Sequence, residues 1–285
     1  MIRRSGLGLA IGFLAAIAFA GPTLAFTGPT NGSFETGTYV DGGGGFEQLN
    51  AGDTSITGWT VDAGSVDWIG TYWSAQDGSM SIDMSGAEAG TLSQTLATTI
   101  GNTYTVSFFL SGNPAGPPTV KTLNVSATGG ATAGYTYDVT GNTLTNMNWT
   151  PETYTFLATS ASTTLSFVST TASAYGPALD KVAITETVPT KSDCKNGGWQ
   201  AMIDNAGNRF KNQGDCVSYF ATRGKNLGAL APAVTVNPTT AGDPGTPQVK
   251  HSTKRHHQAT VQQSSTDGTK NHAGHPHGSK SHHSH

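Results

Sequence analysis

Short runs of alternating residues fill the chain between Phe34 and Glu186, and they limit the possible fold more than any other feature of the sequence. The clearest run is residues 103–111, in which apolar side chains occupy every second position and only Phe109 departs from the alternation. Apolar residues that repeat with period two line one face of a β-strand. Gly, Asn, Pro and Ser separate the runs, as turns require. No window shows a convincing helical period, so the sequence predicts an all-β domain.

The number and spacing of these runs predict a β-sandwich, because two sheets whose apolar sides face each other share one core. We prefer jelly-roll connections for it and place the domain at residues 26–187. An up-and-down barrel remains the alternative, since the number of strands does not separate the two. The strands that we expect cover residues 57–61, 80–84, 91–97, 103–111, 119–126, 135–139, 153–158, 163–169 and 179–185.

The first 25 residues are typical of a signal peptide. Arg3 and Arg4 precede an apolar run at residues 7–20, which is too short to span a bilayer, and residues 23–25 offer a small-residue cleavage site. We therefore expect a secreted protein that begins at Phe26 and has no transmembrane segment.

Charge and histidine content exclude several kinds of function. Residues 26–188 hold 13 acidic residues against two lysines, a net charge of −11, so we expect no nucleic acid as a partner of this part. All nine histidines lie at or beyond His251, and the same block has no cysteine. A catalytic triad based on histidine and a zinc site built on imidazole or thiolate are thereby excluded there.

A second, smaller unit follows a linker at residues 188–192. Residues 193–228, which we call the Cys module, contain Cys194 and Cys216, the only two cysteines in the chain. In an exported protein they predict an intramolecular disulfide, because so small a unit buries little apolar area. Free thiols or an intermolecular bridge are the alternatives.

The C-terminal residues 229–285 are rich in Pro, Gly, Thr, Ser, Lys and His, and we expect them to be disordered. Their net charge rises from +3 with neutral histidines to +12 when all nine are protonated. A plain solvated tail is one interpretation. Weak chelation of metals, or a pH-dependent contact with an anionic wall polymer, is the other.

The aromatic residues divide into two groups. Trp59 and Trp149 lie beside strand-like runs, and we expect them in the core. Trp68, Tyr72 and Trp73 cluster around a glycine in a turn-like stretch, so we expect these three rings on the surface, where they could stack on a sugar.

The chain carries an ordered set of motifs at residues 31–35, 57–59, 64–69, 77–83 and 176–182. Together they resemble the secreted choice-of-anchor C proteins, relatives of the plant cell-wall domain-of-unknown-function family (642). The resemblance covers about residues 29–187 and implies a galactose-binding-like jelly roll. The segment that begins at Cys194 is similar to one found near the ends of many exported bacterial proteins.

The resemblance also implies a structural calcium, which related carbohydrate-binding jelly rolls hold between their first and last strands. Carried over to this sequence, the ligands are Glu35 and Asp180. Asp77, in a turn before a predicted strand, is a candidate for a third carboxylate ligand. The alternative is that Glu35 and Asp180 are ordinary polar residues at strand ends.

We predict a secreted, non-catalytic protein that binds a polysaccharide or cell-wall glycan at the cell surface or in the extracellular matrix. A structural surface protein that mediates protein contacts is the main alternative. A glycoside hydrolase is a remote one, because Asp62 and Asp67 form the densest acidic cluster near the aromatic residues but show no pairing signal.

Overall fold

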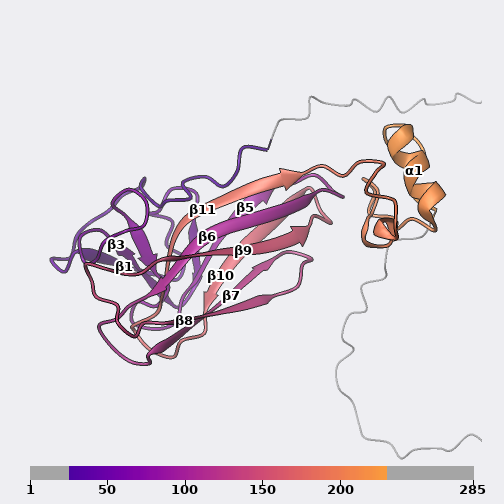
Figure 1. Cartoon of the computed structure of the whole chain (residues 1–285). Helices are drawn as coiled ribbons and strands as arrows, with labels where there is room; N and C mark the ends of the chain where they lie inside the picture. The colour runs from indigo at the N-terminus through magenta and orange to yellow at the C-terminus, as the bar shows by residue number, and fades with distance from the viewer. Residues whose placement is uncertain (1–25, 230–285) are drawn as a thin grey trace, which may run out of the picture. The chain divides into compact units, whose positions relative to one another are not determined.

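Two antiparallel sheets form the main domain in a computed structural model that describes residues 26–229 (Figure 1). The six-stranded sheet has the order β1-β3-β4-β11-β6-β9, and the five-stranded sheet has the order β2-β5-β10-β7-β8. The predicted all-β jelly-roll sandwich is thereby confirmed. The strands are β1 Phe46–Asn50, β2 Thr60–Ala63, β3 Ser65–Ile69, β4 Ser81–Asp83, β5 Thr91–Ala97, β6 Thr103–Gly112, β7 Val120–Ala127, β8 Ala133–Asp138, β9 Thr150–Leu157, β10 Ser162–Ser169 and β11 Pro177–Thr187.

The core lies between the two sheets and follows the alternation of the sequence. In β6, every second residue from Tyr104 to Leu110 is at most 1% exposed, and Trp59 is 2% exposed, as expected. The sequence did not predict β1 or β3. Strand β2 begins at Thr60, three residues after the predicted start.

A second apolar cluster covers the outer face of the six-stranded sheet at one end. Ile69 and Ala178 point away from the main core and pack against Trp73 and Met147, which come from the segments after β3 and before β9. Trp149 is half-buried at the edge of this cluster, so it is only partly in the core position expected. Strands β3, β4 and β11 are therefore covered on both faces here.

The opening turn of the domain is closed onto β11. The Val182 backbone N–H donates to the Gly32 carbonyl at 2.8 Å. A Cβ added to Gly32 would lie 1.9 Å from the Val182 carbonyl oxygen, so no larger side chain fits between the two backbones.

The Cys module has its own small core. Cys194 and Cys216 form the predicted intramolecular disulfide with 5.8 Å between their Cα atoms, and both are fully buried against Phe210 and Tyr219. The 3-10 helix η1 (Gly198–Ala201) and the helix α1 (Gln213–Ala221) surround this core. The predicted signal peptide and nearly all of the predicted tail lie outside the described residues.

Among residues 26–229, no helix is long and apolar enough to cross a membrane.

Gly32→Ala should lower the free energy of unfolding by about 3 kcal/mol, because the methyl group forces the opening turn away from β11. Gly42→Ala is the matched control, since a Cβ there meets only the Phe46 carbonyl at 3.7 Å. Urea denaturation of both variants measures the difference. Equal stability of the two would contradict the close approach at Gly32.

Replacing Cys194 and Cys216 together by Ala should destabilise the Cys module by about 3 kcal/mol on the chain-entropy model, because the bridge closes a loop with a sequence separation of 22. Limited proteolysis should then cut within residues 193–228 while the sandwich stays intact. A module that resists protease equally well without the bridge would contradict this.

Candidate functional site

The three aromatic residues expected on the surface do not form an exposed platform. Trp68 is 1% exposed and donates its Nε1–H to the Phe34 carbonyl at 3.0 Å, and Trp73 is 4% exposed and donates to Ser81 Oγ at 2.8 Å. The surface position expected for these two tryptophans is therefore wrong. Tyr72 is half-buried, with its ring 5.6 Å from that of Phe46.

Burial of these rings has a simple cause. Trp68 lies in β3 and points into the main core, whereas Trp73 lies in the segment that covers the outer face of the sheet. Truncating a buried Trp costs about 3 to 5 kcal/mol, so such variants would report on stability rather than on a binding surface.

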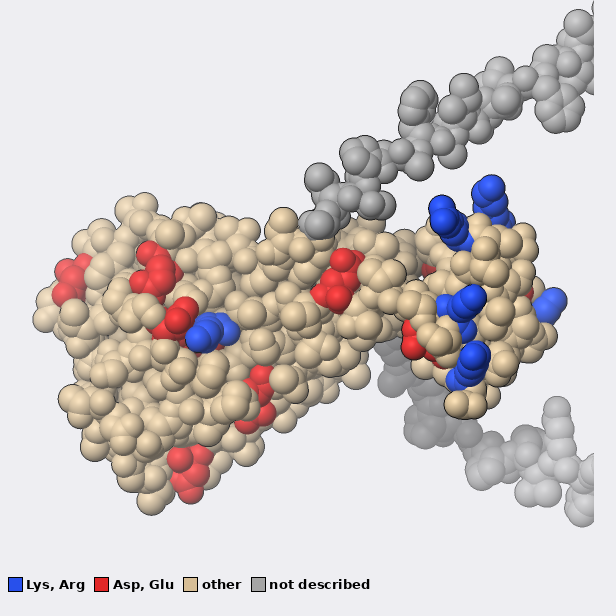
Figure 2. Space-filling model, turned by 45° about the horizontal axis from the view of Figure 1, so that its top comes forward, with Lys and Arg blue, Asp and Glu red and all other residues tan. Residues whose placement is uncertain are grey.

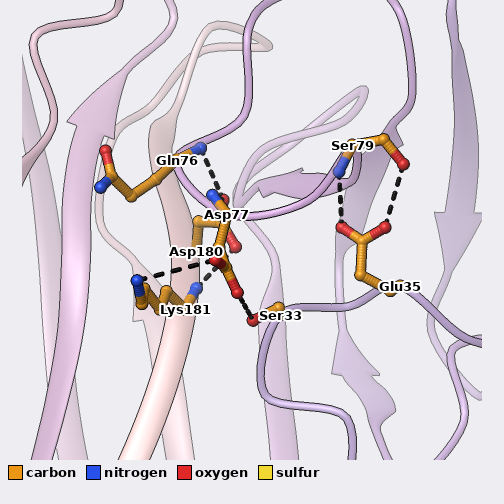
Figure 3. Close-up of polar contacts among 7 residues, drawn as sticks. All are labelled: Ser33, Glu35, Gln76, Asp77, Ser79, Asp180 and Lys181. Carbon is orange, nitrogen blue, oxygen red and sulfur yellow. Dashed lines mark hydrogen bonds and ion pairs between the residues drawn. The ribbon is translucent and has the colours of Figure 1, made fainter.

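Of the three carboxylates predicted to bind calcium, Asp77 and Asp180 lie together, whereas Glu35 makes a separate contact with Ser79 (Figure 3). Glu35 leaves the opening turn and accepts hydrogen bonds from Ser79 N and Oγ, both at 2.9 Å, and from Met80 N at 2.7 Å. Its two oxygens therefore cap the turn that leads into β4 (Figure 3).

Asp180 is fully buried in β11 and holds the segment before β4. Its Oδ2 accepts from Gln76 N at 2.8 Å and from Asp77 N at 3.0 Å, and its Oδ1 accepts from Lys181 N at 2.6 Å. Burial raises the pKa of Asp180 to about 7, and these three hydrogen bonds oppose the rise because they favour the charged form.

Asp77 and Lys181 form the only ion pair within the described part of the chain. Their Oδ1 and Nζ atoms are 3.6 Å apart, and the side chains are 46% and 47% exposed. The other oxygen of Asp77 accepts from Ser33 Oγ at 2.7 Å. The Ser33 hydrogen bond and the Lys181 charge lower the pKa of Asp77, so it stays ionised at neutral pH.

This arrangement does not fit the predicted calcium site. Every oxygen of Glu35, Asp77 and Asp180 faces an N–H, an O–H or an ammonium group, whereas calcium needs several oxygens that are free to turn toward it. Among residues 26–229, no three His, Cys, Asp or Glu side chains are grouped so that they could hold a metal ion. Direct hydrogen bonds join the opening turn to β11 instead.

Lys181 has an unusual backbone. Its φ is 52°, and the register of β11 against β6 shifts between Asp180 and Ala183, which marks a β-bulge. A non-glycine residue in the left-handed region costs energy, and bulges commonly re-aim a side chain next to a functional site. Here the bulge directs the Lys181 ammonium to 5.8 Å from the centre of the Phe109 ring.

Phe109 is the functional candidate that the sequence did not predict. It lies on the outer face of β6, opposite Pro151 of β9 and Asp180 of β11, and is half-buried. The signal was present in the sequence, because Phe109 is the one apolar residue at a polar position of its strand. We call Asp77, Phe109 and Lys181 the Phe109 ledge.

A second pair of carboxylates is buried nearby on the same outer face. The register of β3 and β4 places Asp67 opposite Asp83, which is fully buried and accepts from Ser85 N, Gly176 N and Asn113 Nδ2. Oδ1 of Asp67 is buried without a hydrogen-bond partner. Asp62 is in β2 of the other sheet, so the acidic cluster of Asp62 with Asp67 seen in the sequence is not a pair.

Burial raises the pKa of Asp67 to about 7 and that of Asp83 to about 8, from an ordinary value of 3.8. The folded protein therefore holds protons that the unfolded chain releases above about pH 4. The contribution of protonated Asp67 and Asp83 to the free energy of unfolding is fully present below pH 4. It is lost as the pH rises through 7 to 8.

Asp67→Asn should therefore stabilise the protein at pH 8.5, by about 1 kcal/mol because part of the side chain faces solvent, and should have little effect at pH 4.5. Asp62→Asn, on an exposed position of β2, is the control for the loss of one surface carboxylate. Thermal melts across pH 4 to 9 measure both. An Asp67→Asn curve parallel to that of the parent would contradict the raised pKa.

Comparison with proteins of known sequence and structure finds similar proteins, three of which are described here. Halomucin of Haloquadratum walsbyi (strain DSM 16790 / HBSQ001) is 34% identical over 188 residues, which are 62% of this chain but only 2% of halomucin. The CBM22-1 xylan-binding domain of Xyn10C from Paenibacillus barcinonensis is 17% identical, with a TM-score of 0.36 over 52% of this chain and 97% of that domain. The family 35 carbohydrate-binding module from Clostridium thermocellum is 16% identical, with a TM-score of 0.35 over 50% of this chain and 98% of the module.

The family comparison gives a match to the model described as "Protein of unknown function (DUF642)". The matched residues are 29–185, which run from the opening turn into β11 and include the Phe109 ledge and all the carboxylates described above. Because this match covers more than half of the chain, the protein belongs to the DUF642 family.

Proposed function

We propose that the β-sandwich is a secreted, non-catalytic binding domain for a polysaccharide, and that the Phe109 ledge is its binding site. The observation that carries the proposal is the half-buried Phe109 ring beside an exposed pair of opposite charges on the outer face of the six-stranded sheet.

The chemistry of the ledge matches that of a sugar ring. A pyranose has an apolar C–H face that packs on an aromatic ring, and its rim of hydroxyls both donates and accepts hydrogen bonds. Asp77 can accept such bonds and the Lys181 ammonium can donate them. A few polar groups around an apolar surface are the usual composition of a site for a small organic ligand.

The sheet beyond the ledge offers room for a chain of several sugars. Ser107 and Thr105 follow Phe109 on the outer face of β6, and Thr153 and Thr155 lie opposite them on β9. Ser107, Thr153 and Thr155 are exposed and Thr105 is half-buried. Their small hydroxyl side chains leave the surface open next to the only aromatic ring of this strand face, so a polymer that stacks on Phe109 would extend along β6.

The strained backbone at Lys181 also supports a functional role. A left-handed lysine costs of order 1 kcal/mol or more and persists only where the surrounding fold enforces it. Asp180 enforces it here by accepting the Lys181 backbone N–H and both N–H groups of the 76–77 segment. The same carboxylate thus positions Asp77 and Lys181 together.

A binding role without catalysis fits the groups available in the sandwich. Residues 26–188 contain no histidine or cysteine, and the carboxylate of Asp83 is fully buried rather than open to a substrate. Export is supported by the signal-like residues 1–25 and by the disulfide in the Cys module. The motifs shared with choice-of-anchor C proteins support placement in that group of surface proteins.

Phe109→Ala should weaken polysaccharide binding about tenfold, because the apolar surface for the sugar face is lost. Asp77→Asn and Lys181→Gln should each weaken it less. Affinity electrophoresis against a panel of soluble neutral glucans, xylans and galactans measures binding, and thermal melts check the fold.

Tyr175→Ala is the matched control, since that ring is 37% exposed in the segment between β10 and β11 and should not contribute. Asp62→Asn is the control for loss of one negative charge. If the parent protein binds no polysaccharide in the panel, the sandwich is a structural surface domain instead. If Phe109→Ala binds as well as the parent, the site lies elsewhere.

A further inference from the structure

Residues 189–228 carry an excess of positive charge that the sandwich lacks. They contain six basic residues against three acidic ones, and all six basic side chains are exposed. Figure 2 shows basic side chains gathered on this part of the chain, whereas the sandwich surface shows scattered acidic ones. The basic residues are Lys191, Lys195, Arg209, Lys211, Arg223 and Lys225.

The three acidic residues of this segment accept hydrogen bonds from backbone groups instead of forming ion pairs with the basic side chains, and the segment keeps a net charge of +3. Asp204 is fully buried and accepts from the N–H groups of Ala206, Asn208 and Gly228. It thereby ties the end of the Cys module to the turn at residues 204–208.

The other two acidic residues, Asp193 and Asp215, also accept hydrogen bonds from backbone N–H groups. Asp193 accepts from Thr190 N at 2.7 Å and from Thr190 Oγ1 at 2.8 Å. Asp215, in the first turn of α1, accepts from Lys211 N at 3.1 Å. None of the six basic side chains has a carboxylate partner within 4.0 Å among residues 26–229.

The fold of the Cys module presents these cations on a rigid frame. Lys211 precedes α1, and Arg223 and Lys225 follow it, so both ends of the helix carry positive charge. The disulfide and the Phe210 and Tyr219 rings fix the helix to the rest of the module. Arg209 donates to the Gln200 carbonyl at 3.2 Å, which holds it beside η1 and its half-buried Trp199.

We propose that the Cys module is a second binding site, and that its ligand is an anionic polysaccharide with carboxylate or sulfate groups. Unpaired cations on a rigid surface bind a polyanion by releasing its counterions, without the need for a deep pocket. The site is separate from the Phe109 ledge, and its ligand differs in charge.

A polysaccharide fits this site better than nucleic acid does. The disulfide indicates an oxidising, extracellular setting. Duplex DNA carries one charge per about 1.7 Å, so the sandwich, with its net charge of −11, would repel it on the same chain. A polyuronate bears its charges farther apart than duplex DNA does, so the acidic sandwich repels it less.

The test uses the full chain with polygalacturonate as the probe and neutral dextran as the comparison polymer, at pH 8, where the tail histidines are neutral. The parent should bind polygalacturonate with an affinity that falls as salt rises, whereas any binding of dextran at the Phe109 ledge should not depend on salt. The variant Lys195→Gln, Lys211→Gln, Arg223→Gln, Lys225→Gln keeps two of the six cations. Its slope of log affinity against log salt should fall to about one third, and its affinity at 50 mM salt by about 100-fold.

The matched control changes four basic residues of the C-terminal segment, Lys250, Lys254, Arg255 and Lys270, to Gln, which alters the net charge by the same amount. This control should bind nearly as tightly as the parent. Phe109→Ala should also bind polygalacturonate normally, which separates this site from the ledge. A thermal melt confirms that the module variant is folded.

Three results would overturn the proposal. The control could lose as much affinity as the module variant, which would assign the binding to the tail. The module variant could bind as tightly as the parent. Duplex DNA of matched length could bind the parent more tightly than polygalacturonate does, which would make nucleic acid the partner of this module.

Discussion

The six-stranded sheet depends on β11, which is the last strand of the domain but lies between β4 and β6. Five strands on its two sides are joined into one sheet only when residues 177–187 insert between them. The opening turn and β6 form hydrogen bonds with the backbone of this strand, and the N–H groups of the 76–77 segment donate to its Asp180 side chain. Contacts between such distant residues make loop closure costly, so we expect slow folding that is limited by the docking of β11.

Buried carboxylates accept many of the hydrogen bonds that hold the neighbouring segments to β11. Asp180 receives three backbone N–H groups and Asp83 receives two, together with the amide of Asn113. The segments next to β4 and β11 are irregular, so their backbone N–H groups have no strand partner. The two carboxylates accept the hydrogen bonds of these N–H groups instead. Burial raises the pKa of both groups, and the hydrogen bonds from N–H groups oppose that rise because they favour the charged form.

The sequence predicts the parts of the fold that depend on local pattern. Alternation in residues 103–111 identifies β6 and its buried face, and the two cysteines identify their own bridge. The alternation does not predict strand β3, because the outer face of its sheet is covered as well as the inner face. Ile69 is therefore apolar at a position where simple alternation requires a polar residue. Trp68 was then assigned to a surface turn instead of to the core.

The candidate site was less predictable, because it depends on register and on a bulge. The pairing of Asp67 with Asp83 follows from the alignment of two strands, and no spacing in the sequence reports it. Asp77 and Asp180 lie together, whereas Glu35 contacts Ser79 separately, and the directions of these hydrogen bonds are visible only in the structure. Phe109 is visible in the sequence alone, since it is an apolar residue at an outward position of its strand.

The four outer strands of the sandwich share one property. Strands β1 and β9 end one sheet, β2 and β8 end the other, and each contains an acidic residue. Free strand edges can pair with one another and start aggregation, and like charges on both partners oppose this. Where many copies crowd together, as on a surface or in a matrix, the edges of neighbouring molecules would repel one another. The acidity of the domain thus protects its solubility, and acidification that neutralises these edges would remove that protection. The edge residues are Glu47, Asp62, Asp138 and Glu152.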